Sequence, residues 1–275
     1  MQTPLPLVKA HAYGNDFLIV EEAAVASGAD RTGLARAVCD RHRGVGADGL
    51  MAVRQTRDGA AMRLWNADGS RSELSGNGVR CVAAWLAGVR GLEAGAELVI
   101  DTEAGPKALR LIGRAGGRWT FRAAMGQPAE LRQERLRVGG ADVDLVVLRV
   151  GNPQCVVLGP ATPERLHALA SALAVHPFFP EGTNVELAEV ETPDRVRILI
   201  WERGVGPTEA SGTGACAAAV AAAAFGGAAR AIDVVSPGGS QRVEWTDGGI
   251  WLTGWAEVTA DVTWLGAESA TTDRG

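Results

Sequence analysis

Glu73-Leu74-Ser75-Gly76-Asn77-Gly78 recurs about half a chain later, with changes at two positions, as Glu209-Ala210-Ser211-Gly212-Thr213-Gly214. Both copies read Glu-x-Ser-Gly-x-Gly, and each is followed by an apolar stretch that carries a cysteine, Cys81 or Cys216. Self-similarity at a long, fixed period is the signature of a duplicated structural unit. The repeat therefore predicts two similar α/β domains, one built around each copy.

A helix is predicted to begin at each copy of the repeat. The first follows Gly76-Asn77-Gly78 and runs through residues 82–86, and the second follows Gly212-Thr213-Gly214 and runs through an alanine-rich stretch to Phe225. The second helix has almost no polar face, and a helix that is apolar all round must be buried. A sheet wrapped around it is the expected cover.

Short β-type runs alternate with helices along the rest of the chain. A helix is predicted at 32–41, and a second follows Thr162, which suits an N-cap and precedes Pro163 at the first helical position. The predicted domains are 1–117 and 118–264, with a linker near 113–117 and the tail 265–275 as a candidate to return to the first domain. The predicted strands are 17–20, 62–65, 98–101, 119–122, 143–150, 155–158, 196–201, 243–245 and 250–253.

Bulk composition limits the function classes. The 275 residues suffice for two domains, and 47% hydrophobic with 21% charged residues is ordinary for a globular chain. The net charge of −5, with scattered Lys and Arg, does not suggest a nucleic-acid surface. No run of about 18 apolar residues predicts a membrane span, and the start resembles no signal peptide. The four cysteines form no C-x-x-C pair, so reduced thiols in a cytoplasmic protein are expected.

The Gly-x-Gly turns are the first candidates for chemistry. Backbone N–H groups at a helix N-terminus lack intrahelical partners and lie at the positive end of the helix dipole, so they can bind a carboxylate or a phosphate. A single such turn is more often structural, whereas two equivalent copies favour a binding role. A metal site is not expected, because the four histidines have no ligand spacing. Rossmann, Walker A and Gly-x-Ser-x-Gly patterns are absent.

Polar residues beside glycine recur in loops near predicted strand ends. They include Asn15, Asn66, Asn152 and Asn184, which either serve turn chemistry alone or converge on one zwitterionic ligand. The pair Glu202-Arg203 follows the strand predicted at 196–201. It is either a surface ion pair or, at the mouth of a polar pocket, a site for an ammonium and a carboxylate.

Taken in order, nine motifs between about residues 8 and 260 resemble those of the diaminopimelate epimerase family. They are His11-Ala12-Tyr13-Gly14-Asn15-Asp16-Phe17, Asp40-Arg41-His42-Arg43-Gly44-Val45-Gly46-Ala47-Asp48-Gly49, Asn66-Ala67-Asp68-Gly69-Ser70, Ser75-Gly76-Asn77-Gly78-Val79-Arg80-Cys81, Gly151-Asn152-Pro153, Thr183-Asn184-Val185, Glu202-Arg203-Gly204-Val205-Gly206, Ser211-Gly212-Thr213-Gly214-Ala215-Cys216 and Pro237-Gly238-Gly239.

The resemblance implies an α/β (α+β) fold of two pseudo-symmetric domains, each a mixed, curled sheet around a central helix, with the substrate between them. It implies interconversion of LL- and meso-diaminopimelate in lysine and peptidoglycan synthesis, without pyridoxal phosphate, metal or other cofactor. The implied partner is a small amino acid, with no nucleic acid and no membrane, and a homodimer is an open expectation. The substrate-binding residues carried over are Asn15, Asn66, Gly76, Asn77, Asn152, Asn184, Glu202, Arg203, Gly212 and Thr213.

Four positions depart from the family pattern. The resemblance places a catalytic cysteine before each Gly-x-Gly, where this chain has Ser75 and Ser211, a histidine at Gln154 and a glutamate at Pro207. A thiol with a pKa near 8.5 needs about 2 kcal/mol to ionise at pH 7, whereas a water-like hydroxyl needs on the order of 10 kcal/mol. Helix dipoles contribute roughly 1–2 kcal/mol, so serine is expected to be a poor base.

Three interpretations of the serines follow. Ser75 and Ser211 occupy the two acid/base positions of an epimerase, through engineering or natural divergence, and the changes at Gln154 and Pro207 favour divergence. Alternatively, a diverged isomerase of the same fold uses carboxylates, with Glu73, Glu209 or Glu202 as candidates. A third interpretation is an inactive homologue that binds an amino acid without turning it over. Cys81 and Cys216 are expected to pack in the core rather than to replace the family's thiols.

Overall fold

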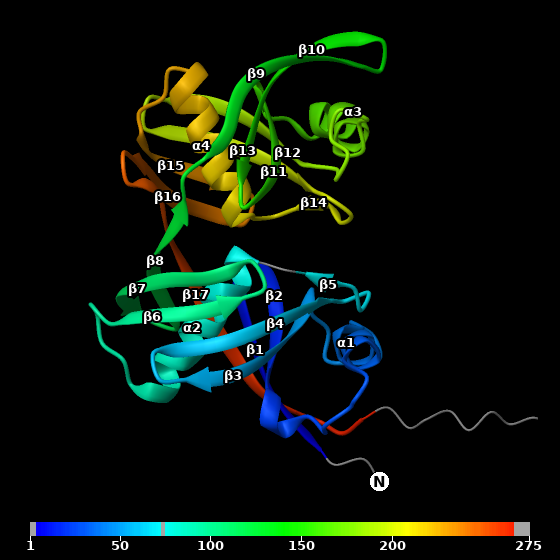
Figure 1. Ribbon diagram of the computed structural model, residues 1–275, viewed down its shortest axis with the longest axis vertical. Helices are drawn as coiled ribbons and strands as arrows, with labels where there is room; N and C mark the ends of the chain where they lie inside the picture. Colours follow the sequence, from blue (N-terminus) through cyan, green and yellow to red (C-terminus); the bar gives the residue numbers. More distant parts are fainter. Residues whose placement is uncertain (1–3, 73–74, 267–275) are drawn as a thin grey trace, which may run out of the picture.

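The computed structural model describes residues 4–72 and 75–266, and Figure 1 shows two lobes stacked along the long axis. The helices are α1 (Arg31–Cys39), α2 (Gly76–Arg90), α3 (Pro163–Ala174) and α4 (Gly212–Phe225), with a 3-10 turn at Glu22–Ala24. The strands are β1 (Leu5–Ala12), β2 (Asn15–Glu21), β3 (Gly49–Thr56), β4 (Gly59–Asn66), β5 (Arg71–Ser72), β6 (Glu97–Thr102), β7 (Gly105–Ala115), β8 (Arg118–Gly126), β9 (Ala129–Val138), β10 (Ala141–Val150), β11 (Asn152–Leu158), β12 (Asn184–Thr192), β13 (Arg195–Glu202), β14 (Gly206–Thr208), β15 (Ala231–Ser236), β16 (Gly239–Thr246) and β17 (Gly249–Trp264).

The order of elements is the same in the two lobes. The series β1-β2-α1-β3-β4-β5-α2-β6-β7 of the first lobe returns as β10-β11-α3-β12-β13-β14-α4-β15-β16 in the second. Strand pairing repeats as well. In the first lobe, β2–β3 and β4–β6 are parallel, and β3–β4 and β6–β7 are antiparallel. In the second lobe, the corresponding pairs β11–β12 and β13–β15 are parallel, and β12–β13 and β15–β16 are antiparallel. The duplication inferred from the repeat is thus present in the topology.

Sheet closure explains how each central helix is buried. In the first lobe, β1, β2, β3, β4, β6, β7, β8 and β17 pair in a ring that returns to β1. Helix α2 runs through this ring, and residues 77–87 are all buried. In the second lobe, residues 212–222 of α4 are all buried against β10–β13 and β15–β17. This confirms the predicted mixed, curled sheet around a central helix.

Strands β8 and β17 connect the lobes (Figure 1). The first part of β17 places Ile250 and Leu252 in the core around α4, and the later Ala256 lies in the core around α2. The stretch 113–117 predicted as a linker is instead the end of β7 and the β7–β8 turn. The domain boundary after residue 117 stays a prediction, and it falls inside this hairpin, whose Trp119 and Phe121 pack in the first core. The later half of β17 runs along β1. The return of the tail to the first domain stays a prediction, because residues 267–275 lie outside the described residues.

The predicted helices and strands all fall on observed elements of the same type. Helix 32–41 is α1 at Arg31–Cys39, and α3 has Thr162 as its N-cap, with the Thr162 side chain accepting from Arg165 N at 3.3 Å. Among the described residues, no helix is long and apolar enough to cross a membrane.

Candidate active site between the two helix N-termini

The two serines of the repeat are the N-caps of the central helices. Ser75 (φ −132°, ψ 118°) precedes α2, and its Oγ accepts from Gly78 N at 3.0 Å. Ser211 (φ −136°, ψ 129°) precedes α4, and its Oγ accepts from Gly214 N at 3.2 Å. The same residue, backbone conformation and capping bond therefore occur in both lobes, as the pseudo-twofold arrangement requires.

The two helix N-termini meet at the junction of the lobes. A Cβ built on Gly76 would lie 3.8 Å from the Gly212 Cα, so the first residues of α2 and α4 are almost in contact. The Asn77 Nδ2 crosses the junction and donates to the Ala210 backbone oxygen at 3.2 Å. Because the leading N–H groups of a helix lack intrahelical acceptors, two sets of such donors and two positive dipole ends converge here.

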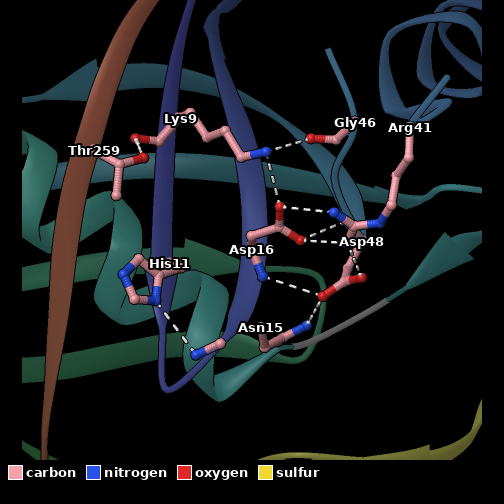
Figure 2. Close-up of polar contacts among 9 residues, drawn as sticks. Lys9, His11, Asn15, Asp16, Arg41, Gly46, Asp48 and Thr259 are labelled. Carbon is pink, nitrogen blue, oxygen red and sulfur yellow. Dashed lines mark hydrogen bonds and ion pairs between the residues drawn. The ribbon is translucent and has the colours of Figure 1, made fainter. Parts of the chain in front are cut away.

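A polar network in the first lobe fixes Asn15 (Figure 2). Asn15 Nδ2 donates to Asp48 Oδ2 at 2.8 Å, and Asn15 Oδ1 accepts from Asn77 Nδ2 at 3.2 Å. Arg41 bridges Asp48 (2.8 Å) and Asp16 (2.7 Å), and Lys9 lies 3.0 Å from Asp16. Burial opposes ionisation of Asp16, but the bonds from Arg41 and Lys9 outweigh it and hold its pKa below the usual value. The amide of Asn15 is therefore held on both sides, next to the first turn of α2.

The second lobe places a carboxyl beside Ser211. Glu202 ends β13, and its carboxyl lies beside the hydroxyls of Ser211 and Thr208. Burial raises the pKa of Glu202 to about 7, although the hydroxyl of Ser211 lowers it; the negative charge of Asp48, from the first lobe, adds to the increase. A carboxyl that titrates near pH 7 at the N-terminus of α4 is suited to take up and release a proton.

A second carboxyl, Glu186 on β12, is fully buried behind the same turn. Oriented with its nitrogen toward Glu186 (3.0 and 3.3 Å), the Gln154 amide places its oxygen 3.2 Å from the Thr213 hydroxyl. Burial raises the pKa of Glu186 well above its usual value, and the neighbouring Glu202 adds to the effect. Burial therefore favours the protonated form of Glu186, whose carboxyl lies against Gln154 and the first turn of α4.

The remaining predicted residues fall in three places. Asn184 begins β12 and its Oδ1 accepts from Arg203 N at 2.9 Å, so these two lie together near Glu202. Asn152 begins β11 and contacts the Gln154 amide. Asn66 ends β4 and donates to Ser70 at 2.9 Å, which ties it to its own turn. Of the alternative carboxylates, Glu209 is exposed and lies against Gly14 of the other lobe, and Glu73 lies outside the described residues.

The two helix cysteines are part of the cores. Cys81 and Cys216 are both 0% exposed, and burial raises the pKa of each thiol to about 12. Neither supplies a thiolate near pH 7, which agrees with the packing role expected from the sequence.

Comparison with known proteins identifies the family. The profile described as diaminopimelate epimerase matches residues 7–128 and 146–259. The chain belongs to the diaminopimelate epimerase family. A diaminopimelate epimerase from Desulforudis audaxviator is 41% identical over 280 residues, covering 96% of this chain and all of that protein.

Solved structures carry the same fold at low identity. A predicted epimerase from Pseudomonas aeruginosa matches with a TM-score of 0.73 at 16% identity, over 96% of this chain and all of the other. A probable proline racemase from Agrobacterium radiobacter matches with a TM-score of 0.72 at 16% identity, over 98% and 94% of the two chains. These two solved structures thus share the two-lobed fold of this chain.

Sequence reasoning assigned no role to three residues that stand out in the structure. Asp48 and Arg80 lie in motifs that carry the family resemblance, and Glu186 lies in the buried part of β12, a strand that was not predicted. Burial of the Glu186 carboxyl is costly unless it is hydrogen-bonded, but that burial could not be seen in the sequence because β12 was not predicted.

Proposed function

We propose that the protein is a cofactor-independent amino-acid epimerase of the diaminopimelate type, in which Glu202 and Ser211 act together on one face of the substrate Cα. The observation that carries the proposal is the Glu202 carboxyl, with a pKa of about 7, beside Ser211 at the N-terminus of α4. A hydroxyl alone is too weak a base, but a hydroxyl paired with a carboxylate can pass a proton on.

The proposed step transfers two protons together. Ser211 Oγ takes the Cα proton while its own hydroxyl proton moves to the Glu202 carboxylate, and the electron pair of the broken C–H bond moves into the substrate carboxylate. Helix N-termini at Gly76-Asn77 and Gly212-Thr213 would hold that carboxylate and stabilise its added charge. Return of a proton from the Ser75 side would invert the centre.

The far end of the substrate is assigned to the remaining polar residues. Asn15, Asn66, Asn152, Asn184 and Arg203 are proposed to bind the second amino-acid group of a diaminopimelate-like ligand. The similarity to diaminopimelate epimerases over nearly the whole chain supports this substrate class. A cytoplasmic location, a small-molecule partner and a homodimer are proposed from the same similarity.

A second candidate is binding without turnover. It is favoured by the capping bonds, because both serine hydroxyl oxygens already accept from their own helices, at Gly78 and Gly214. An oxygen committed to a backbone N–H has reduced basicity.

Deuterium exchange at Cα separates the two candidates. LL-diaminopimelate is incubated with the protein in heavy water, and loss of the Cα proton signal is followed by NMR while binding is measured by calorimetry. Exchange that saturates with ligand supports the epimerase, and tight binding without exchange supports the binding protein. Absence of both overturns the substrate assignment.

Restoring thiols provides the gain-of-function arm. The double variant Ser75→Cys/Ser211→Cys is expected to epimerise at least about 100-fold faster, because a thiol ionises far more readily than a hydroxyl. The single variants Ser75→Cys and Ser211→Cys are the matched controls, since each carries only one thiol. A double variant that binds diaminopimelate and remains inert contradicts the epimerase assignment.

A further inference from the structure

Arg80 is a buried cation with no acidic partner among the described residues. It lies on α2, one turn after Ser75, and its side chain is 1% exposed. Its guanidinium donates to two neutral amides, Asn77 Oδ1 and Gln241 Oε1 (3.1 Å), and its Nε has no partner in the described part of the chain. Arginines buried this deeply are usually paired with a carboxylate.

The surroundings of Arg80 compensate its charge only weakly. The guanidinium lies 5.8 Å from the centroid of the Tyr13 ring, a favourable but modest contact. Burial lowers the pKa of Arg80, yet a guanidinium remains protonated in proteins. An unpaired charge in this position is unfavourable, so its counter-charge is expected from outside the described residues.

The position of Arg80 identifies where that counter-charge would sit. A Cβ built on Gly212 would lie 3.6 Å from Arg80 Nη1, so the guanidinium contacts the first residue of α4 although it belongs to α2. Through Asn77 it also reaches the first turn of its own helix and, beyond it, the Ala210 oxygen. The positive ends of both helices and one full positive charge therefore converge on the same place.

The pseudo-twofold repeat supplies this charge only once. The residue five places after Ser211 is Cys216, where the first lobe has Arg80 five places after Ser75. Burial keeps the Cys216 thiol neutral, with a pKa of about 12. A single cation between two otherwise matched turns fits a single negative charge, as in one carboxylate group.

We propose that Arg80 is a positioning residue whose buried guanidinium is the counter-charge of one ligand carboxylate held between the Ser75 and Ser211 turns. It acts through Asn77 and the backbone at Gly212. When the Cα–H bond breaks and its electron pair moves into that carboxylate, Arg80 stabilises the additional negative charge while the proton goes to the acid/base group. This inference rests on the proposed function for the identity of the ligand, but not for its charge.

The test compares Arg80→Gln, which removes the charge and keeps an amide donor, with Arg80→Lys, which keeps the charge. Arg90→Gln is the matched control, because Arg90 lies at the other end of α2 and donates to the Thr56 and Gly59 oxygens at 2.7 and 3.0 Å. Affinity for diaminopimelate is measured by calorimetry, and the melting temperature of each ligand-free variant is measured by calorimetric scanning. A second probe, sodium acetate against sodium chloride at equal ionic strength, reports carboxylate binding without the rest of the substrate.

Arg80→Gln is expected to bind diaminopimelate at least 30-fold more weakly, with a ligand-free melting temperature equal to or above that of the unsubstituted protein. Arg80→Lys is expected to bind diaminopimelate more tightly than Arg80→Gln and less tightly than the unsubstituted protein, because lysine can carry the charge but lacks the planar fork of donors. Arg90→Gln is expected to leave the affinity unchanged. Acetate should raise the melting temperature of the unsubstituted protein and not that of Arg80→Gln. If diaminopimelate does not bind but acetate discriminates the variants, the substrate assignment fails and Arg80 keeps its role. The inference is overturned if Arg80→Gln binds normally, if it loses stability and affinity together, or if neither probe affects the unsubstituted protein.

Discussion

The Ser75 and Ser211 turns have nearly the same backbone and very different surroundings. The Ser75 turn carries the Asn77 amide and, on the same helix, the buried Arg80, whose guanidinium also reaches Gly212 of the other turn. Around Ser211 the neighbours are two carboxyls: Glu202, with a pKa of about 7, and Glu186, whose pKa is raised by burial. The duplicated part of the sequence therefore builds two similar anion-binding turns. The groups around the turns differ, with a guanidinium from α2 and carboxyls from β12 and β13.

Because the neighbours of the two serines differ, the proposed chemistry is not symmetric even though the fold is. Inversion of a stereocentre needs an acid/base group on each face, and the described residues supply a carboxyl titrating near pH 7 on the Ser211 face. The charges of the two sides also interact, because Asp48 of the first lobe raises the pKa of Glu202 in the second. Substitutions that act on one side can therefore test the comparison directly.

The largest expected effect is that of Glu202→Gln. Removing the titrating carboxyl from the Ser211 face should slow Cα deuterium exchange by about 100-fold or more, because general acid–base groups contribute that much. NMR exchange rates measure the effect, with Glu244→Gln as a control; Glu244 is on β16 and pairs with Arg122 at 2.9 Å. Full exchange in Glu202→Gln would assign the proton transfer to another group and remove the asymmetry.

Glu202 also makes stability depend on pH. Because burial raises its folded pKa to about 7, the folded chain retains a proton that the unfolded chain loses above about pH 4.3, so the free energy of unfolding falls as the pH rises through this window. Glu202→Gln has no carboxyl to titrate, so its stability relative to the unsubstituted protein should rise by about 3 kcal/mol between pH 4 and pH 8. Urea unfolding at several pH values measures this difference. A pH-independent difference would mean that Glu202 has an ordinary pKa.

Asp48→Asn tests the coupling between the lobes. The substitution removes the charge that Arg41 binds and that holds Asn15, so affinity for the amino-acid ligand should fall about tenfold. Loss of the like charge should also lower the pKa of Glu202, which NMR titration of the labelled carboxyl measures. Asp144→Asn, which breaks the exposed Arg135–Asp144 pair, is the control. An unchanged Glu202 pKa would show that the two sides act independently.

The sequence predicted the fold from local signals. The repeat and the apolar helix ending at Phe225 were sufficient to infer duplication and burial, and the cap at Thr162 located α3. The strands that were missed, such as β9 and β12, lack clean alternation: β9 is largely exposed and β12 carries Glu186 in its buried part. Their place is set by pairing with distant strands, which no short window of sequence contains.

The site was only partly predictable for the same reason. Ser75 and Ser211 were found because the repeat marks them, and Asn15 because of its glycine. The roles of Asp48 and Arg80 depend on contacts across long separations, such as Asn77 to Ala210 and Arg80 to Gln241. A motif more readily identifies the residues that contact a ligand than the charged residues that hold them in place.

The smallest effect distinguishes the two turns by burial. Ser75→Ala and Ser211→Ala each remove an N-cap, which typically costs about 1 kcal/mol of stability. Ser211 is 5% exposed whereas Ser75 is half-buried, so the Gly214 N–H left without its acceptor is less able to find water than the Gly78 N–H. We therefore expect about 1–2 kcal/mol for Ser211→Ala and about 0.5–1 kcal/mol for Ser75→Ala, by urea unfolding, with Thr162→Ala at α3 as a reference cap. Equal losses of stability, or the reverse order, would mean that burial does not distinguish the two turns. The turns would then differ in their electrostatic surroundings alone.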